Sequence, residues 1–263
     1  MGEPDWPGEG TSTPERISVY RYPLYPITPT HPRSDSTMSL ILTIDTALSE
    51  ASVALSQDGR CTAVHLSENP FKHAEFVHVA VQELCKQKGL QLQDIDAVAV
   101  TAGPGSYTGL RVGMASAKGF AYALSKPLIA INTLEVMACR ALQTLSPAHQ
   151  EIRLFCPMID ARRMEVFCAV YDRSLKTILE PHARILDKDS FKEALKREPI
   201  LFFGSGSAKW KDLEQVGQEN FTEIGQLYTA LCQLSAQRFQ DKNFSHLIHS
   251  EPFYVKDFYN GAQ

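Results

Sequence analysis

The sequence contains no uninterrupted apolar run of about 18 residues, so it predicts no membrane-spanning helix. It also lacks a basic surplus, because 26 Lys and Arg are outweighed by 30 Asp and Glu, which gives a net charge of −4. A protein that binds nucleic acid by itself usually has a basic surplus, since phosphate contacts supply much of the affinity. The composition therefore argues against strong RNA or DNA binding by this chain alone, while leaving room for a local basic patch.

Paired cysteines are absent as well. None of the six cysteines forms a C-x-x-C pair, and several lie in apolar periodic runs such as "LFCPMI" and "EVFCAVY". They are Cys61, Cys85, Cys139, Cys156, Cys168 and Cys232. Buried, reduced thiols in a cytoplasmic protein are favoured over disulfides or metal ligation.

The glycine-rich stretch "AVTAGPGSYTGLRVGMASAKG", residues 99–119, looks like a phosphate-binding loop but lacks the established fingerprints. No Gly-Lys-Ser/Thr occurs in the chain, which excludes a Walker loop. The spacing Gly103-x-Gly105-x-x-x-Gly109 departs from the dinucleotide pattern, and the next strand ends without an acidic residue. We therefore expect no bound cofactor.

Helix packing explains the glycines better. Gly109, Gly113, Ala117 and Ala121 recur every fourth residue, so they share one helix face that has almost no side-chain bulk. Such a face lets another backbone approach closely, and Gly is otherwise unfavourable in a helix interior by up to about 1 kcal/mol. The neighbour is either a segment of the same chain, such as a helix at 72–88, or another chain. Spacing alone favours internal packing.

The pattern of the chain predicts a duplicated α/β architecture. Residues 1–37 are rich in Pro, Ser and Thr, and we expect a disordered or non-native extension there. In both halves that follow, strands precede helices. We expect lobes at 38–145 and 146–263, with the last residues packing back on the first lobe. In the first half we expect strands at 40–44, 51–55 and 95–101, a helix at 72–88, a helix to about 124, a strand in "KPLIAIN" and a helix capped by Thr133. In the second half we expect paired strands "IRLFCPMID" and "MEVFCAVYD", a strand in "REPILFFGSGS" and a helix in "YTALCQLSAQRF".

Few side chains suggest catalysis. Asp45 ends a strand, where a carboxylate either orients a metal-bound phosphate or water, or caps a turn. His73 and His78 are five residues apart on one helix and diverge by about 140°, and the i+4 position from His73 is Val77, so no zinc site is expected.

Two further polar segments are interpreted as turns. "DARRMEVF" places Asp160, Arg162, Arg163 and Glu165 at a hairpin tip, which favours a solvated turn with ion pairs. "FFGSGSAKW" contains Gly204 and Gly206 between a strand and a helix, where a strand-to-helix turn is favoured over a second nucleotide loop.

Several segments in order resemble the TsaB family, also called YeaZ. They are "ILTIDTALSEASVAL", "KHAEFVHVAVQEL", "IDAVAVTAGPGSYTGLRVGMASAKGFAYAL", "PLIAINTLEVMA", "MIDARRMEVFCAVYD" and "HLIHSEPFYVKDF". The resemblance runs from Met38 to the end, and GPGSYTGLRVG is its most specific part. It implies an actin/hexokinase-like (ASKHA) fold with two related lobes of mixed sheet and flanking helices, related to the larger TsaD family.

The resemblance also implies a role in tRNA modification. Members of this family are non-catalytic partners of TsaD, which transfers the threonylcarbamoyl group to adenosine in tRNA, and the ATPase TsaE joins the pair. In this scheme tRNA is bound through the complex, and the same helices allow a homodimer when the chain is alone. TsaD-type proteins carry H-x-x-x-H for a metal, whereas His73 is followed by Val77 here, which agrees with a non-catalytic subunit.

The resemblance further implies two sets of site residues. The partner interface would be formed by His73, Val77, Ala80, Leu84, Tyr107, Gly109, Leu110, Gly113, Met114, Ala117 and Ala121. A degenerate nucleotide cleft would contain Asp45, Thr46, Gly103, Gly105 and Ser106. The alternatives are a nucleotide phosphohydrolase or M22 glycoprotease-like peptidase that uses Asp45, and a homodimeric regulator.

Overall fold

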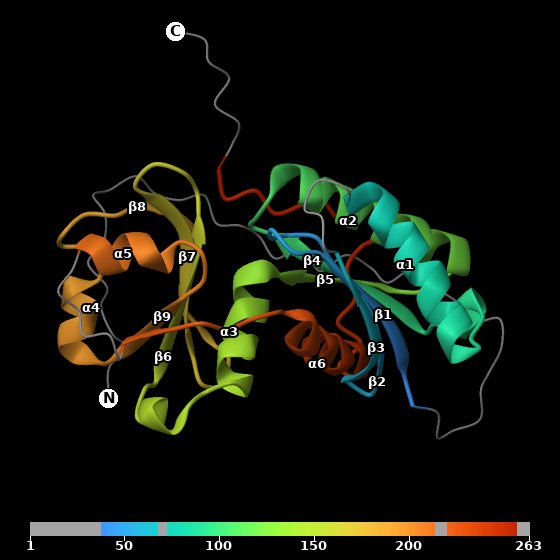
Figure 1. Ribbon diagram of the computed structural model, residues 1–263, viewed down its shortest axis with the longest axis horizontal. Helices are drawn as coiled ribbons and strands as arrows, with labels where there is room; N and C mark the ends of the chain where they lie inside the picture. Colours follow the sequence, from blue (N-terminus) through green and yellow to red (C-terminus); the bar gives the residue numbers. More distant parts are fainter. Residues whose placement is uncertain (1–37, 68–72, 214–219, 257–263) are drawn as a thin grey trace, which may run out of the picture.

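The computed structural model describes residues 38–67, 73–213 and 220–256 (Figure 1). The predicted extension at 1–37 lies outside this part of the chain. The first half contains β1 (Leu40–Asp45), β2 (Ser52–Gln57), β3 (Arg60–Leu66), α1 (His73–Lys88), η1 (Leu92–Asp94), β4 (Ala97–Gly103), α2 (Tyr107–Leu124), β5 (Leu128–Asn132), α3 (Thr133–Gln143) and η2 (Pro147–His149). The second half contains β6 (Leu154–Asp160), β7 (Glu165–Asp172), β8 (Thr177–Ile185), α4 (Lys192–Arg197), β9 (Ile200–Phe203), α5 (Ser207–Leu213), β10 (Phe221–Thr222) and α6 (Tyr228–Gln240).

The two halves repeat one sheet topology. The first sheet has the order β3-β2-β1-β4-β5, and the second has the order β8-β7-β6-β9-β10. In each, the first strand pairs antiparallel with a hairpin and parallel with the strand that follows the hairpin. The outer pairs β4–β5 and β9–β10 are also parallel. This confirms the predicted duplication of mixed sheets.

Helices and sheets alternate in five layers (Figure 1). One face of the first sheet packs against α1 and α2, and one face of the second packs against α4 and α5. Helices α3 and α6 lie between the sheets, where buried residues of both halves form one apolar cluster, including Ile41, Ile129, Leu134, Phe155 and Leu231. Successive strand residues serve different layers: Ala97 and Ala99 face the central cluster, whereas Val98 and Val100 face α1 and α2.

The C-terminal segment returns to the first half. Helix α6 packs on the first sheet beside α3, although it follows the last strand of the second sheet. Beyond it, the Ser245 amide donates to the Leu128 carbonyl, and the Phe253 amide donates to the Ala102 carbonyl at 2.6 Å. Lys256 pairs with Glu165 of β7, so the last described residues connect the two halves.

Two local predictions need correction. Asn132, rather than Thr133, caps α3, because its side chain accepts a hydrogen bond from the Leu134 amide at 2.9 Å. The Thr133 hydroxyl instead accepts from the Gly103 amide and ties α3 to the end of β4. Strand β8 was not predicted, since Pro181 interrupts the apolar pattern; the strand lies at the edge of its sheet, where proline is tolerated. No described helix is long and apolar enough to cross a membrane.

Candidate functional site

The glycine stretch holds α2 against the loop that follows β1. A Cβ atom on Gly105 would lie 2.2 Å from the Ala47 carbonyl oxygen, and one on Gly109 would lie 2.0 Å from that of Thr46. A Cβ atom on Gly113 would lie 2.2 Å from the Thr46 hydroxyl oxygen. These distances leave no room for a side chain, so the glycines serve close packing within the chain.

Most residues of the predicted partner interface are buried within the chain, and the interface itself stays a prediction. The α1 residues Val77, Ala80 and Leu84 are at most 2% exposed, and Leu110, Met114, Ala117 and Ala121 of α2 are at most 3% exposed. Apart from Leu110, these side chains pack in the cluster between the helices and the first sheet. An every-fourth spacing defines a single helix face, and here the strands of the same chain cover that face. The opposite faces of the two helices are the ones that this packing leaves uncovered by the strands.

One predicted interface residue, Tyr107, is not buried in this way. Tyr107 at the start of α2 is 41% exposed, and its ring contacts Tyr254 of the C-terminal segment. Arg111 lies over the Tyr107 ring and donates to its hydroxyl. The side chain of His73, the first residue of α1, lies outside the described part of the structure, so its predicted role stays a prediction.

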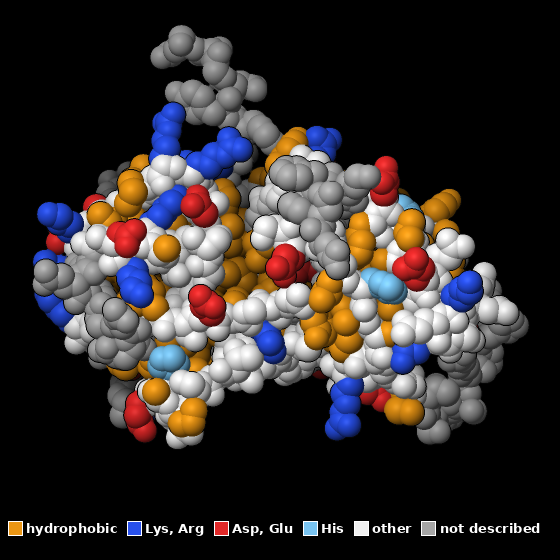
Figure 2. Space-filling model, in the orientation of Figure 1, with side chains coloured by type: hydrophobic (Ala, Val, Ile, Leu, Met, Phe, Trp, Pro, Cys, Tyr) orange, Lys and Arg blue, Asp and Glu red, His pale blue; other side chains and the backbone are white. Residues whose placement is uncertain are grey.

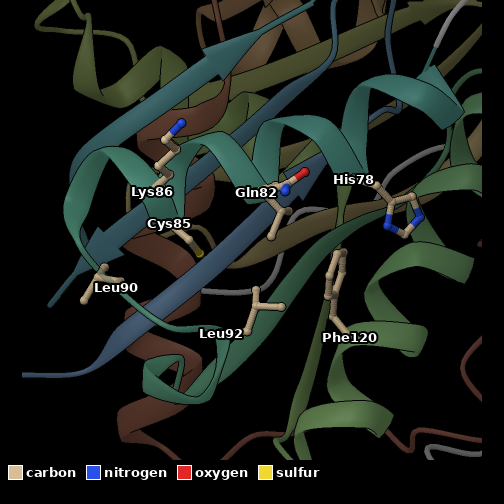
Figure 3. A pocket seen from close by; sticks show the side chains of 8 residues that line it. His78, Gln82, Cys85, Lys86, Leu90, Leu92 and Phe120 are labelled. Atoms are coloured by element: carbon tan, nitrogen blue, oxygen red, sulfur yellow. The ribbon is translucent and has the colours of Figure 1, made fainter.

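The outer surface of α1 and α2 contains a groove of about 480 Å³. Its lining residues are His78, Val81, Gln82, Cys85, Lys86, Leu90, Leu92 and Phe120. Figure 3 shows Phe120 extending from α2 toward α1, with His78 at the same end, and their ring centroids are 5.3 Å apart. The groove thus has an apolar floor and a polar rim along α1.

Exposed apolar residues lie on the same two helices. Val79 of α1 is 52% exposed and Tyr122 of α2 is 78% exposed. At Gly119 on α2, an added Cβ atom would meet nothing within 4 Å. The sequence analysis did not include these residues because it placed the interface on the small-residue face of α2. The apolar residues that lie off that face were the feature of the sequence that could have identified them.

The predicted nucleotide cleft is occupied by contacts within the chain. Asp45 is 4% exposed, and its Oδ1 accepts hydrogen bonds from the Ala47 amide at 3.1 Å and the Thr101 hydroxyl at 2.8 Å. Burial raises the pKa of this carboxyl, against the lowering effect of the two hydrogen bonds. Of the two interpretations of Asp45, these contacts support the turn-capping one.

The other residues of the predicted cleft also form contacts within the chain. The buried Thr46 hydroxyl donates to the Gly109 carbonyl at 2.7 Å, and the Ser106 side chain caps α2 by accepting from the Gly109 amide. Gly103 has φ +115°, and a Cβ atom there would lie 2.5 Å from the Phe253 carbonyl oxygen. The structure does bring the predicted cleft residues together, with the C-terminal segment covering Gly103.

The remaining polar segments behave as turns. Asp160 pairs with Lys209 at 2.7 Å, which lowers the pKa of the Asp160 carboxyl. Gly204 and Gly206 connect β9 to α5, as predicted. Among the residues that the structure describes, no three His, Cys, Asp or Glu side chains come together as a metal site.

Fold and site together define the class of protein. Two lobes, each with an antiparallel hairpin on a mixed sheet and helices on both faces, form an actin/hexokinase-like (ASKHA) fold, as predicted. Among solved structures, YeaZ from Pseudomonas aeruginosa has a TM-score of 0.69 and 25% identity, covering 82% of this chain and 100% of that one.

Sequence comparisons narrow the class to a family. A family model described as TsaD, tRNA N6-adenosine threonylcarbamoyltransferase, matches residues 67–261. The tRNA threonylcarbamoyladenosine biosynthesis protein TsaB of Escherichia coli (strain K12) is 30% identical over 227 residues, 82% of this chain and 94% of that protein. A tRNA N6-adenosine threonylcarbamoyltransferase of Clostridium perfringens (strain SM101 / Type A) is 48% identical over 64 residues, 24% of this chain and 19% of that protein. The chain belongs to the TsaB (YeaZ) family of tRNA threonylcarbamoyladenosine biosynthesis proteins.

Proposed function

We propose that this chain is a non-catalytic subunit that binds a TsaD-type transferase through the outer faces of α1 and α2. The observation that carries the proposal is the apolar surface on these two helices, which the described residues leave exposed on the side away from the sheet. Val79, Phe120 and Tyr122 supply apolar and aromatic contact area, and the groove beside Phe120 accepts a partner side chain. Local similarity to a transferase of this type supports a partner that is related to this chain.

The contacts around Asp45 support a role other than catalysis. A carboxylate that already accepts two internal hydrogen bonds and is 4% exposed is poorly placed to hold a metal-bound phosphate. In this proposal the transfer chemistry takes place on the TsaD-type subunit. A TsaE-type ATPase and tRNA then join the pair.

The test is a double variant of the outer face, Val79→Glu with Gly119→Trp. Both positions are exposed, so the folded chain tolerates the changes, while a charge and a bulky ring obstruct a docked helix. We expect native mass spectrometry to show a one-to-one complex of wild-type chain with the TsaD-type subunit and loss of that complex for the variant. Circular dichroism and Tm should be unchanged.

Ile185→Glu is the matched control, because Ile185 is 72% exposed but lies on β8, in the other half. It should pair normally. Pairing of the double variant at wild-type affinity would refute the proposed interface. A wild-type chain recovered only as a homodimer would favour the homodimeric regulator, and ATP or peptide hydrolysis by the chain alone would favour the catalytic alternative.

A further inference from the structure

The turn between β6 and β7 has an unusual backbone. Arg162 and Arg163 have φ angles of +69° and +48°, so two consecutive non-glycine residues adopt the left-handed conformation. The Ala161 amide donates to the Glu165 carbonyl, and the Glu165 amide donates to the Arg162 carbonyl. The residues that suit such paired left-handed positions in a hairpin are Asn and Gly. Arginine at both positions is unfavourable for the turn, and a broken local rule of this kind points to a function.

The structure holds this turn in place from three sides. The Asp160 carboxylate accepts from the Arg162 amide and pairs with Lys209, which also donates to the Glu165 carbonyl. The Leu186 amide donates to the carbonyl of Met164. These contacts fix the backbone while leaving the arginine side chains exposed.

The charges at the turn are unbalanced. Its two acids are already paired, Asp160 with Lys209 and Glu165 with Lys256. Neither Arg162 nor Arg163 forms an ion pair with any residue that the structure describes. These two ion pairs and two arginines, six residues in all, therefore carry two uncompensated positive charges on a chain whose net charge is −4. Figure 2 shows basic side chains gathered at the end of the second lobe where this turn lies (Figure 1).

We propose that the Arg162–Arg163 turn binds the phosphate backbone of tRNA. A guanidinium group donates in a fork that matches two phosphate oxygens, and phosphate contacts position RNA without reading its sequence. This proposal rests on the proposed function, since tRNA would reach the turn as the substrate of the assembled complex. The turn lies on β6 and β7, whereas the proposed protein interface lies on α1 and α2, so the two contacts do not compete.

The test measures tRNA binding by the full chain alone as a function of salt, starting at about 20 mM, where phosphate contacts are strongest. The key variant is Arg162→Asn with Arg163→Gly. It removes both charges and supplies the residues that the turn prefers. We expect its Tm to rise, its tRNA affinity to fall about tenfold, and the slope of log K against log salt to decrease by about 1.5.

Two further variants separate charge from structure. Arg153→Gln with Lys176→Gln removes two exposed charges from the opposite end of β6 and β7, where Leu154 pairs with Asp172, and should bind tRNA as the wild type does. Arg162→Lys with Arg163→Lys keeps the charge but not the fork, and should retain the salt slope with weaker binding.

Three outcomes would overturn the proposal: no tRNA binding by the wild-type chain at low salt, equal losses in the turn variant and the opposite-end control, or full binding by the turn variant. A turn variant that binds tRNA normally but no longer pairs with the TsaD-type subunit would identify the turn as a protein contact. Because tRNA binding is measured without that subunit, failure of the proposed α1–α2 interface would be seen separately.

Discussion

The hydroxyl of Thr46 donates a 2.7 Å hydrogen bond to the carbonyl oxygen of Gly109, which links the loop after β1 to the first turn of α2. The contact brings two backbones together at a distance that only glycine permits. It explains why, in a segment that resembles a phosphate-binding loop, the space beside the glycines is filled by residues of the same chain. It also determines which face of α2 remains for a partner.

Gly109→Ala should destabilise the fold, because its Cβ atom would lie 2.0 Å from the Thr46 carbonyl oxygen. We expect a loss of about 1–3 kcal/mol in the free energy of unfolding, as in other overpacked sites. Gly119→Ala on the same helix meets nothing within 4 Å and should gain about 0.5–1 kcal/mol through helix propensity. Urea denaturation measures both, and equal effects of the two substitutions would contradict the packing argument.

Asp45 should make stability depend on pH. Its pKa is raised in the folded state, so the folded protein retains a proton that the unfolded chain releases. Stability from this group is present below the unfolded pKa of about 3.9 and is lost as the pH rises through the folded value. Asp45→Asn keeps a hydrogen-bond acceptor and removes the charge. It should therefore be more stable relative to wild type at pH 7 than at pH 4, measured by urea denaturation. A difference that is independent of pH would contradict the assignment.

Cys61 should be the most reactive of the six thiols. It is the only one of the six cysteines that is half-buried rather than buried, and a hydrogen bond with Cys232 lowers its pKa to about 7. Because the thiolate is the nucleophile, alkylation by iodoacetamide should rise through about pH 7. Peptide mass spectrometry after short labelling reports each site.

The variant Cys232→Val removes that hydrogen bond and should move the labelling midpoint toward the ordinary thiol pKa of about 8.5. Cys232→Ser retains a hydroxyl and is the control. An unchanged midpoint in the valine variant would show that Cys232 does not set the reactivity of Cys61.

Lys118 should hold the C-terminal segment on α2. Its ammonium group donates to the carbonyls of Ile248 and Ser250 at 2.8 and 2.9 Å. Lys118→Met should make the amide of Phe253, which is bonded to β4, exchange its hydrogen about three- to tenfold faster, corresponding to about 1 kcal/mol. Lys126→Met is the control, since Lys126 follows the same helix but pairs with Asp96, the residue before β4. If the Phe253 amide exchanged its hydrogen equally slowly in both variants, contacts other than those of Lys118 would hold the C-terminal segment in place.

Much of the fold could be predicted from the local pattern. Apolar periodicity located most strands of both halves and helices α1, α2 and α6, and Gly89, with φ +64°, follows the end of α1 as expected. The repeated order of strands and helices predicted the duplication. Strand β8 escaped because Pro181 and its half-exposed neighbours give no alternating signal at a sheet edge.

What the sequence by itself determined is the periodicity: which residues of a helix share a face, and which strands precede which helices. The tertiary structure decided what covers each face. Spacing identified Gly109, Gly113, Ala117 and Ala121 as one small-residue face, but a face that fits closely against a strand of the same chain has the same spacing as one that fits another protein. Only the position of Thr46 against Gly109 shows that the neighbour is internal. The turn at Arg162 and Arg163 also needed the tertiary structure. The sequence gives the charges of the two arginines. That Lys209 and Lys256 pair with the two acids of the turn, and so leave the arginines uncompensated, follows from contacts between residues distant in the sequence.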